Sequence, residues 1–320
     1  MGYPIERKFV VGVSSNALFD LRKEDEIFKE NGISAYRQFQ TKNETTILNK
    51  GLAFPFIRRF LHINAVYKEE SPVEVVLLSK NSPETGLRVF NSIKHYGLNI
   101  TRGAFTSGDS PFKYIPPFNI SLFLSTNEND VQNAVEAGYP AGRFLETQAS
   151  DDTDDGELRV AFDFDGVIAD DSAEKIYQET NQLSLYHEHE TTNAEIPLEP
   201  GPLGDFFKKL SFFQKLEAKK QEKNSNYKRI LKTAIITARN APAHERAIKT
   251  LKNWGVGVDD LFLLGGIEKK RILQVVKPHI YFDDQLTHLD SSIKDIPLVH
   301  IPFGVVNHNK KKGEFEIRKI

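Results

Sequence analysis

Two carboxylates that directly follow an apolar segment are the residues best suited to chemistry. The run 160–162 leads into Asp163, and Asp165 stands two residues further on, before Gly166. In the hydrolysis of a phosphate monoester, Asp163 would attack phosphorus as the nucleophile, and Asp165 would act first as acid and then as base. Gly166 would allow the tight turn that this placement needs. An Asp-x-Asp pair alone is also typical of a surface turn, so the hypothesis depends on the rest of the chain.

Phosphoryl transfer also needs hydrogen-bond donors and positive charge around the phosphoryl oxygens. Thr237 ends the apolar run 234–236 with a hydroxyl group, and Lys269 follows a pair of glycines with a cation. Both are predicted catalytic residues, together with Asp163 and Asp165. Lys270 stands next to Lys269 and remains an alternative source of the positive charge.

A second carboxylate pair, Asp283 and Asp284, follows the apolar segment 280–282. Magnesium binds few protein carboxylates and completes its coordination shell with water and phosphate oxygens. We therefore predict Mg²⁺ as the cofactor, with oxygen ligands drawn from Asp163, Asp165, Asp283 and Asp284. A turn or a helix cap would explain an isolated Asp-Asp pair, but the order of these groups along the chain favours a metal site.

Composition excludes several other kinds of site and partner. The 320 residues include no cysteine, which rules out disulfides, thiolate zinc sites and cysteine nucleophiles. His187 and His189 lack a third ligand nearby, which argues against a transition-metal site. The formal net charge of −2 predicts no general attraction for polymeric nucleic acid or for anionic membranes. Without a signal-peptide pattern or an apolar run near 20 residues, we expect a cytoplasmic protein.

The elements that position these groups alternate between strands and helices in the second half of the chain. We expect strands over 159–162, 231–236, 261–264 and 279–282, with helices over 241–254 and 269–276 and a mainly helical insert over 172–216. This alternation is typical of an α/β fold with a doubly wound parallel sheet. Ligands of such sheets bind at the carboxyl ends of the strands, which is where the predicted catalytic and metal-binding residues fall.

The first half of the chain resembles the second, which indicates an internal duplication. At a constant offset of 158, Ser79 falls on Thr237, Arg88 on Arg246, Lys94 on Lys252, Gly97 on Gly255 and Gly108 on Gly266. The first half lacks the catalytic carboxylates. Ser14 and Asn16 replace Asp163 and Asp165, and Ser125 and Thr126 replace Asp283 and Asp284.

We therefore predict two tandem halves, of which only the second is catalytic. The predicted divisions are a degenerate half over 1–149, an acidic linker over 150–157, a catalytic half over 158–308 with a cap over about 171–228, and a tail over 309–320. The linker carries no apolar residue and is expected to be solvated. The degenerate half would pack against the active one, or would retain a nucleotide site at 79–82 and 107–109.

These motifs resemble known families. The chain resembles the haloacid dehalogenase superfamily of phosphatases, whose four motifs are matched by Asp163–Val167, Thr237, Lys269 and Asp283-Asp284. The segments 11–15, 82–93 and 282–285 resemble the cytosolic 5'-nucleotidase I family, and this likeness covers nearly the whole chain. Phe164 and Gly166 occupy positions that vary in that family, whereas both aspartates of the motif are present.

The resemblance implies haloacid dehalogenase-like halves and Mg²⁺-dependent hydrolysis of nucleoside 5'-monophosphates, with AMP favoured. The partner is then a small-molecule nucleotide. Substrate specificity is expected in the cap, which closes over the leaving group and excludes water. The residues predicted to face the substrate are His189, Glu190, Asn193 and Arg239; for the first three, an exposed polar helix end is the alternative.

The same residues are compatible with other functions. The same groups would suit a phosphatase of another small phosphomonoester. A non-catalytic nucleotide-binding sensor would bind AMP without turnover, although the complete acidic set argues against it. A receiver-like signalling domain has its acidic pair before the phosphorylated aspartate and lacks a large insert after its first strand. The sequence also leaves open whether copies of the chain form a homo-oligomer.

Overall fold

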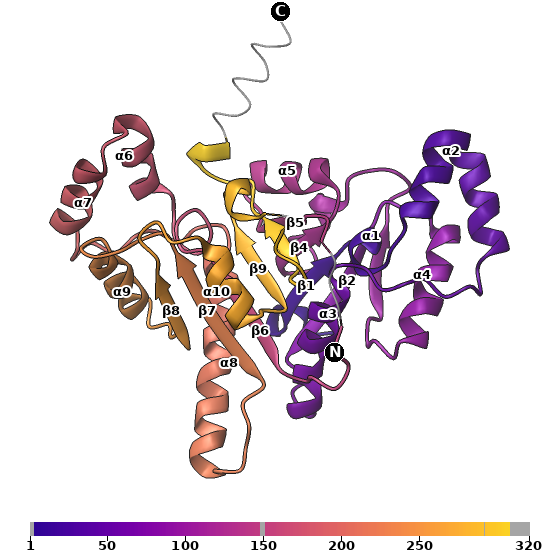
Figure 1. The fold of residues 1–320 in the computed structure, drawn as a ribbon. Coiled ribbons are helices and arrows are strands. Elements are labelled where there is room, and N and C mark those ends of the chain that lie inside the picture. The colour runs from indigo at the N-terminus through magenta and orange to yellow at the C-terminus, as the bar shows by residue number, and fades with distance from the viewer. Residues whose placement is uncertain (1–2, 148–150, 291, 308–320) are drawn as a thin grey trace, which may run out of the picture. The chain divides into compact units, whose positions relative to one another are not determined.

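The computed structural model describes residues 3–147, 151–290 and 292–307. The chain divides into two compact units, Met1–Gly156 and Glu157–Ile320, and each is an α/β arrangement of strands and helices (Figure 1). The division falls inside the acidic segment predicted over 150–157. The predicted tail over 309–320 lies outside the described residues.

The strands of the N-terminal unit form a parallel sheet. Their order is β3-β2-β1-β4-β5, with bounds β1 Phe9–Val13, β2 Val73–Ser79, β3 Arg102–Phe105, β4 Ile120–Ser125 and β5 Ala141–Phe144. Every residue of β1, β2 and β4 is buried, as expected for parallel strands that are covered on both faces. The accompanying helices are η1 Ile5–Arg7, α1 Ser15–Leu18, α2 Arg22–Lys42, α3 Phe54–Val66, α4 Pro83–His95, η2 Pro111–Tyr114 and α5 Glu128–Glu136.

The C-terminal unit repeats this pattern of strand order. Its parallel strands follow β10-β9-β6-β7-β8, with bounds β6 Leu158–Phe162, β7 Leu231–Thr237, β8 Asp260–Leu263, β9 Ile280–Asp283 and β10 Leu298–His300. Its helices are α6 Ser172–Thr180, α7 Leu183–Thr192, α8 Gly204–Lys223, α9 His244–Asn253, α10 Lys269–Val276 and η3 Leu286–His288. The predicted α/β class with a parallel sheet is confirmed. Strand β6 lies between β7 and β9, so the carboxyl ends of these three strands are neighbours.

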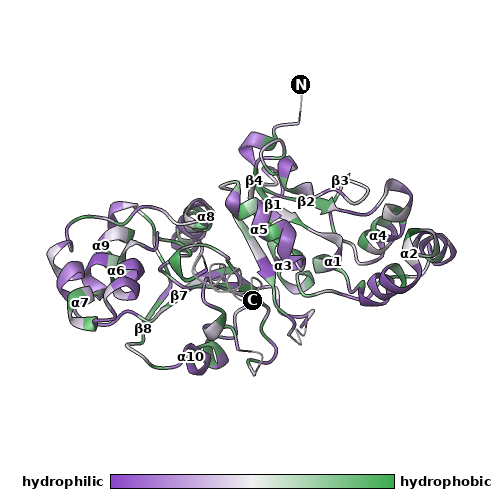
Figure 2. Ribbon diagram, turned by 90° about the horizontal axis from the view of Figure 1, so that it is seen from above, coloured by the Kyte–Doolittle hydropathy of each residue, from purple (hydrophilic) through white to green (hydrophobic). Residues whose placement is uncertain are grey.

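The insert that follows β6 has two parts that pack in different places. Helices α6 and α7 contact each other, α7 also contacts α9, and Tyr186 packs with Ala173 and Ala243 in a small apolar cluster. Helix α7 carries both hydrophilic and hydrophobic residues (Figure 2), and Leu183 and Leu185 are exposed at 55% and 39%. Helix α8, in contrast, packs on the sheet, where its Phe207 ring meets Phe162 edge-to-face at 5.4 Å. The range of 171–228 predicted for the cap thus includes α8, a helix that packs on the sheet.

The acidic segment is not fully solvated, which differs from the prediction. The side chain of Asp151 is only 5% exposed, and its carboxylate pairs with Lys50, Arg58 and Arg59 at 2.9, 3.1 and 2.8 Å. Arg59 is itself buried and also donates to the carbonyl of Asp152. These cations fasten the segment to the start of α3 within the N-terminal unit. Although burial acts in the opposite direction, Lys50 and Arg58 hold the pKa of Asp151 below its ordinary value.

Asp151→Asn should lower the stability of the N-terminal unit by about 2–3 kcal/mol, because it leaves the buried Arg59 guanidinium without its carboxylate. Since the pKa of Asp151 is lowered, its contribution is complete above the ordinary carboxyl pKa and is lost as the pH falls. The difference from wild type should therefore shrink below about pH 4. Hydrogen exchange of α3 peptides along a urea gradient measures it.

Asp154→Asn is the matched control, because Asp154 is exposed in the same segment. It should change stability by less than about 0.5 kcal/mol. Equal effects of the two variants, or a difference that persists unchanged at acidic pH, would contradict the anchoring role of Asp151.

Within the described residues, none of the helices combines the length and the apolar character needed to cross a membrane.

Candidate active site

Asp163 and Asp283 come together at the carboxyl ends of neighbouring strands. Asp163 directly follows β6, and its backbone N–H donates to the carbonyl of Phe282 at 2.8 Å, which continues the pairing of β6 with β9. Asp283 is the last residue of β9, and its side chain is fully buried. Thr237 likewise ends β7, on the other side of β6. The prediction that distant segments converge at one edge of the sheet agrees with this placement.

Lys269 lies between the two aspartates. Its Nζ atom is 2.6 Å from Oδ2 of Asp163 and 2.8 Å from Oδ2 of Asp283, and its side chain is 3% exposed. Lys270 points elsewhere, and its exposed ammonium donates to the hydroxyl of Ser292. Of the two lysines considered from the sequence, only Lys269 is placed among the carboxylates.

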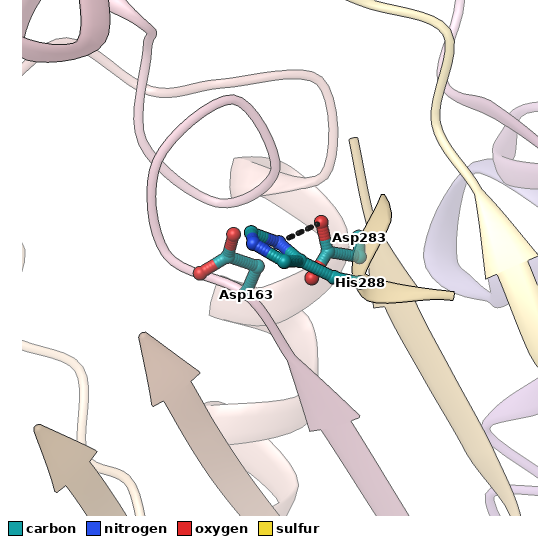
Figure 3. A group of neighbouring side chains, drawn as sticks. All are labelled: Asp163, Asp283 and His288. Carbon is teal, nitrogen blue, oxygen red and sulfur yellow. Dashed lines mark hydrogen bonds and ion pairs between the residues drawn. The ribbon is translucent and has the colours of Figure 1, made fainter. Parts of the chain in front are cut away.

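Asp283 is held by several donors besides Lys269. It accepts hydrogen bonds from the Tyr281 hydroxyl and from the backbone N–H of Gln285, and His288 Nδ1 lies 3.2 Å from its Oδ1 (Figure 3). Burial disfavours the charge of Asp283, but Lys269 and His288 outweigh it and hold the pKa of Asp283 below its usual range. Asp283 is therefore a carboxylate at neutral pH.

For Asp163 and Asp284, in contrast, burial outweighs the neighbouring cation, and the pKa is raised. Burial raises the pKa of Asp163 to about 7, and Asp283 adds to this shift, while Lys269 opposes it. Burial also raises the pKa of Asp284, as do the charges of Asp283 and Asp163. Three carboxylates thus share a small buried region that contains one ammonium group among the described residues. Such a region is stabilised by an additional cation.

The donor set fits a divalent metal ion. Ligand atoms of Asp163, Asp283 and His288 lie within 4.8 Å of one another. Oδ1 of Asp284 is buried and accepts no hydrogen bond from the described part of the chain. An unsatisfied carboxylate oxygen beside other carboxylates is what a metal-binding group looks like without its ion. His288 was not predicted from the sequence, because a lone histidine in a loop carries no signal until the turn after β9 places it against Asp283.

Gly166 keeps the two acidic segments close together. Its φ angle is +71°, and a Cβ atom built on it would lie 2.6 Å from Oδ2 of Asp284. A side chain at this position would therefore meet both a strained backbone and the Asp284 carboxylate.

Gly166→Ala should reduce phosphate release about 10- to 100-fold, because displacement of Asp284 by a fraction of an ångström disturbs the metal ligands. The apparent affinity for a divalent metal ion, measured by the metal dependence of the rate, should fall in parallel. Gly257→Ala is the control, since Gly257 has no atom within 4 Å of an added Cβ and no positive φ. If Gly166→Ala matches the activity and metal dependence of the control, this packing argument is wrong.

Asp165 pairs with a cation of its own, Arg239. Both oxygens of Asp165 accept hydrogen bonds from the Arg239 guanidinium, from Nε at 2.7 Å and from Nη2 at 2.6 Å. The guanidinium also lies 5.3 Å from the centre of the Phe164 ring and 6.0 Å from that of Tyr186. Asp165, which was predicted as a metal ligand, thus directs its carboxylate to a cation of the chain.

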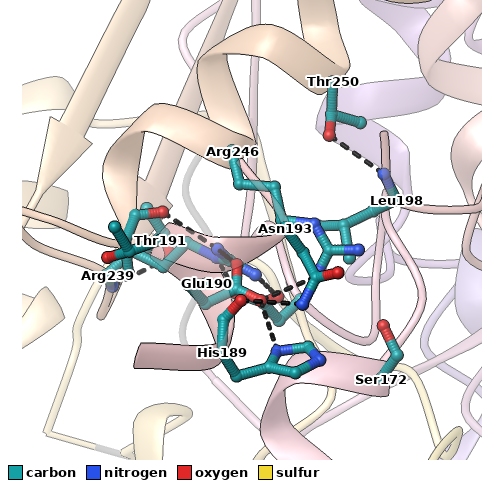
Figure 4. A network of polar contacts seen from close by, with 12 residues as sticks. Ser172, His189, Glu190, Thr191, Asn193, Leu198, Arg239, Arg246 and Thr250 are labelled. Atoms are coloured by element: carbon teal, nitrogen blue, oxygen red, sulfur yellow. Dashed lines mark hydrogen bonds and ion pairs between the residues drawn. The ribbon is translucent and has the colours of Figure 1, made fainter. Parts of the chain in front are cut away.

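Glu190 connects this arginine to α9 (Figure 4). Its carboxylate is 1% exposed, with Oε2 accepting from Arg239 and Oε1 accepting from Arg246 at 2.7 Å. His189 Nδ1 approaches the same Oε1 at 3.2 Å. Both oxygens of Glu190 are engaged by arginines, so the structure places this residue as an anchor for Arg239. The sequence offered one signal for Arg246, namely its match to Arg88 in the internal repeat.

The other residues predicted to face the substrate differ in their surroundings. Asn193 follows α7 as its C-terminal cap, and its Nδ2 donates to the carbonyl of His189 at 2.9 Å. His189 is partly exposed. Oγ1 of Thr237 accepts from the backbone N–H of Arg239 at 3.2 Å, which leaves the hydroxyl proton available as a donor.

Comparisons with known proteins agree over both units. A sequence model of the 5'-nucleotidase family matches residues 1–308. Human cytosolic 5'-nucleotidase 1B is 32% identical over 288 residues, which is 88% of this chain and 47% of the relative. The chain therefore spans about half the length of this relative. No solved structure matches the chain significantly.

Proposed function

This chain belongs to the 5'-nucleotidase family, and we propose that it hydrolyses nucleoside 5'-monophosphates, AMP above all, to nucleoside and phosphate with Mg²⁺. The family match confirms the resemblance to the cytosolic 5'-nucleotidase family. The observation that carries the proposal is the placement of Lys269 between Asp163 and Asp283 at adjacent strand ends. Asp163 can attack phosphorus there, while Lys269 supplies positive charge beside it and Asp283 pairs with this lysine.

In the first step Asp163 attacks phosphorus, and the bond to the nucleoside oxygen breaks to leave an aspartyl phosphate. Lys269 favours the carboxylate form of Asp163 and offsets the charge of the phosphoryl oxygens. The Thr237 hydroxyl can donate to one of these oxygens. Asp163, Asp283 and Asp284 would hold Mg²⁺, which would supply further positive charge to the phosphoryl group when bound.

Asp165 is the proposed acid and base. It would protonate the departing nucleoside oxygen and then take a proton from the water that hydrolyses the aspartyl phosphate. Because both of its oxygens accept from Arg239 in this structure, that pair has to open before Asp165 can donate to a leaving oxygen. Arg239 and Glu190 thereby link the position of α7 to the availability of Asp165.

The family relationship also supports finer points of the proposal. We infer that both units are haloacid dehalogenase-like, with α6 and α7 as the cap of the C-terminal unit and the N-terminal unit non-catalytic. A cytoplasmic location is inferred from the name of the human relative.

A substrate panel tests the proposal. Phosphate release is measured with AMP, other nucleoside monophosphates, deoxynucleotides and sugar phosphates, each with Mg²⁺ and with EDTA. The proposal requires that nucleoside monophosphates have the highest kcat/KM and that EDTA abolishes turnover. A preference for sugar phosphates would instead support a phosphatase of another small phosphomonoester, and binding of AMP without turnover would support a nucleotide sensor.

Glu190→Gln should lower kcat about 10-fold and change KM less than about 3-fold, because an amide weakens the anchor of Arg239 without removing a substrate contact. Glu195→Gln is the control, since the Glu195 side chain is 83% exposed in the same insert, and it should leave both constants unchanged. A rise in KM at constant kcat for Glu190→Gln would show that Glu190 binds the substrate, as predicted from the sequence.

A further inference from the structure

A cavity of about 1040 Å³ opens at the carboxyl ends of β1, β2 and β4 in the N-terminal unit. Its floor includes Ser14, Asn16, Lys80, Asn81 and Thr126, and helix α2 contributes to its walls. The hydrolysis proposed for the C-terminal unit assigns this cavity no role.

The framework around this cavity repeats that of the C-terminal unit in detail. Three hydrogen bonds of the N-terminal unit have counterparts in the C-terminal unit. Gly51 N–H donates to Leu18 O as Gly201 N–H donates to Ile168 O, and Leu48 N–H donates to Ser92 Oγ as Leu198 N–H donates to Thr250 Oγ1. Likewise, Arg88 Nε donates to Thr46 O as Arg246 Nε donates to Ile196 O. Arg88 also contacts Gln40 and Glu24, much as Arg246 contacts Glu190. The N-terminal cavity thus lies in the same framework as the phosphoryl site proposed in the C-terminal unit.

The polar residues on the floor of the cavity differ from those at the matching positions of the C-terminal unit, although the surrounding framework is the same. Ser14 and Asn16 follow β1 where Asp163 and Asp165 follow β6, so the carboxylates of the nucleophile and the acid are absent at these positions. Pro111 begins η2 where Lys269 begins α10. Hydroxyl and amide groups can form hydrogen bonds to a phosphate. They do not supply the carboxylate nucleophile or the carboxylate metal ligands that the proposed hydrolysis uses.

A cation and an unsatisfied donor replace the lost groups. Lys80 follows Ser79, the last residue of β2, at the position where Ala238 follows β7. Its ammonium pairs with Asp130 at 2.8 Å and has no second carboxylate partner among the described residues, so two of its three donors remain for a ligand. Nδ2 of the neighbouring Asn81 is buried and has no acceptor among the described residues, while its Oδ1 accepts from Tyr36 at 3.0 Å. Both side chains line the cavity.

The wall formed by α2 is suited to an organic group. Phe28 and Ile33 line the cavity, and they are 50% and 54% exposed. The Tyr36 ring meets Phe28 edge-to-face at 5.9 Å. The cavity thus has an apolar and aromatic wall and, on its floor, hydrogen-bond donors suited to a phosphate. This combination fits a molecule with a ring at one end and a phosphate at the other.

We propose that the N-terminal unit binds an organic phosphate ester without cleaving it, with Lys80 and Asn81 on the phosphate and α2 on the organic part. This site is separate from the proposed hydrolysis, because Ser14 replaces the nucleophile and Ser125 and Thr126 replace the predicted metal ligands Asp283 and Asp284.

Hydrogen-exchange mass spectrometry of the whole chain tests the site, with AMP as the probe. The Asp163→Asn background and EDTA prevent turnover. Added AMP should protect segments 79–82, 106–109 and 125–128, and adenosine without phosphate should protect them at least 10-fold less at equal concentration. Hydrolysis is measured separately on the wild type with Mg²⁺, so failure of one proposal is distinguishable from failure of the other.

Two variants locate the contacts. Lys80→Ala and the isosteric Asn81→Asp should each raise the AMP concentration needed for half-protection of these segments at least 10-fold. Lys94→Ala is the control, because Lys94 is exposed on α4 and does not line the cavity. No protection of the three segments at millimolar AMP would overturn the proposal. So would protection that Asn81→Asp and Lys80→Ala both leave unchanged.

Discussion

Asp163→Asn should reduce phosphate release from AMP by a factor of about 10⁴ or more, because an amide cannot form the aspartyl phosphate. The substitution keeps the size of the side chain and removes a carboxylate whose burial is already unfavourable, so the fold should persist. Steady-state assays with Mg²⁺ measure the rate, and circular dichroism checks the fold.

Asp205→Asn serves as the control for this substitution. Asp205 lies on α8 with a side chain that is 69% exposed, and its loss should leave the rate within about twofold of wild type. Retention of a tenth of the wild-type rate by Asp163→Asn would assign the nucleophile to another group, such as water.

Lys269→Met should reduce kcat about 10³-fold, because it removes the positive charge that faces both the nucleophile and the phosphoryl oxygens. Methionine approximates the length of lysine, so the change mainly removes charge between two buried carboxylates. With Lys269 absent, the repulsion between Asp163 and Asp283 is no longer offset by an ammonium group of the chain.

Lys270→Met is an unusually close control, since the neighbouring lysine is exposed and bonds to Ser292. It should stay within about twofold of wild type. Equal losses in the two variants, with both folded, would show that the position of Lys269 between the aspartates is not the source of its effect.

The strands and most helices of the C-terminal unit were predictable from local patterns. The buried strands of a parallel sheet are continuous apolar runs, and the polar residues that end them mark the ligand-binding edge. Helix α10 has the predicted bounds, whereas α9 begins at His244 rather than near 241, after Pro242. The strand-end positions of Asp163, Thr237 and Asp283 follow from the same logic.

Contacts that depend on tertiary packing were not predictable. Asp151 belongs to an acidic run that reads as solvated, yet its partners come from α3 and the segment before it, about 90 to 100 residues earlier in the chain. Glu190 resembles an exposed helix end in sequence, but two arginines of the C-terminal unit bury it. In both cases a charged residue becomes buried because distant cations compensate for its desolvation, and no local pattern records that.

The two units share a backbone framework but differ in the polar side chains at the ends of their strands. Where Asp163 and Asp283 end strands in one unit, Ser14 and Ser125 stand at the ends of β1 and β4 in the other. Backbone hydrogen bonds around these positions are alike, so the difference lies in the side chains that would handle a phosphoryl group. The proposed catalytic and binding roles of the two units follow from that difference.

Rapid acid quench during AMP turnover, followed by peptide mass spectrometry, shows whether Asp163 carries the phosphoryl group between the two steps. We expect a transient phosphoryl group on the peptide that contains Asp163, formed only with Mg²⁺ and absent in Asp163→Asn. Turnover without any phosphorylated peptide at millisecond quench times, or a phosphoryl group on a different residue, would contradict this role of Asp163.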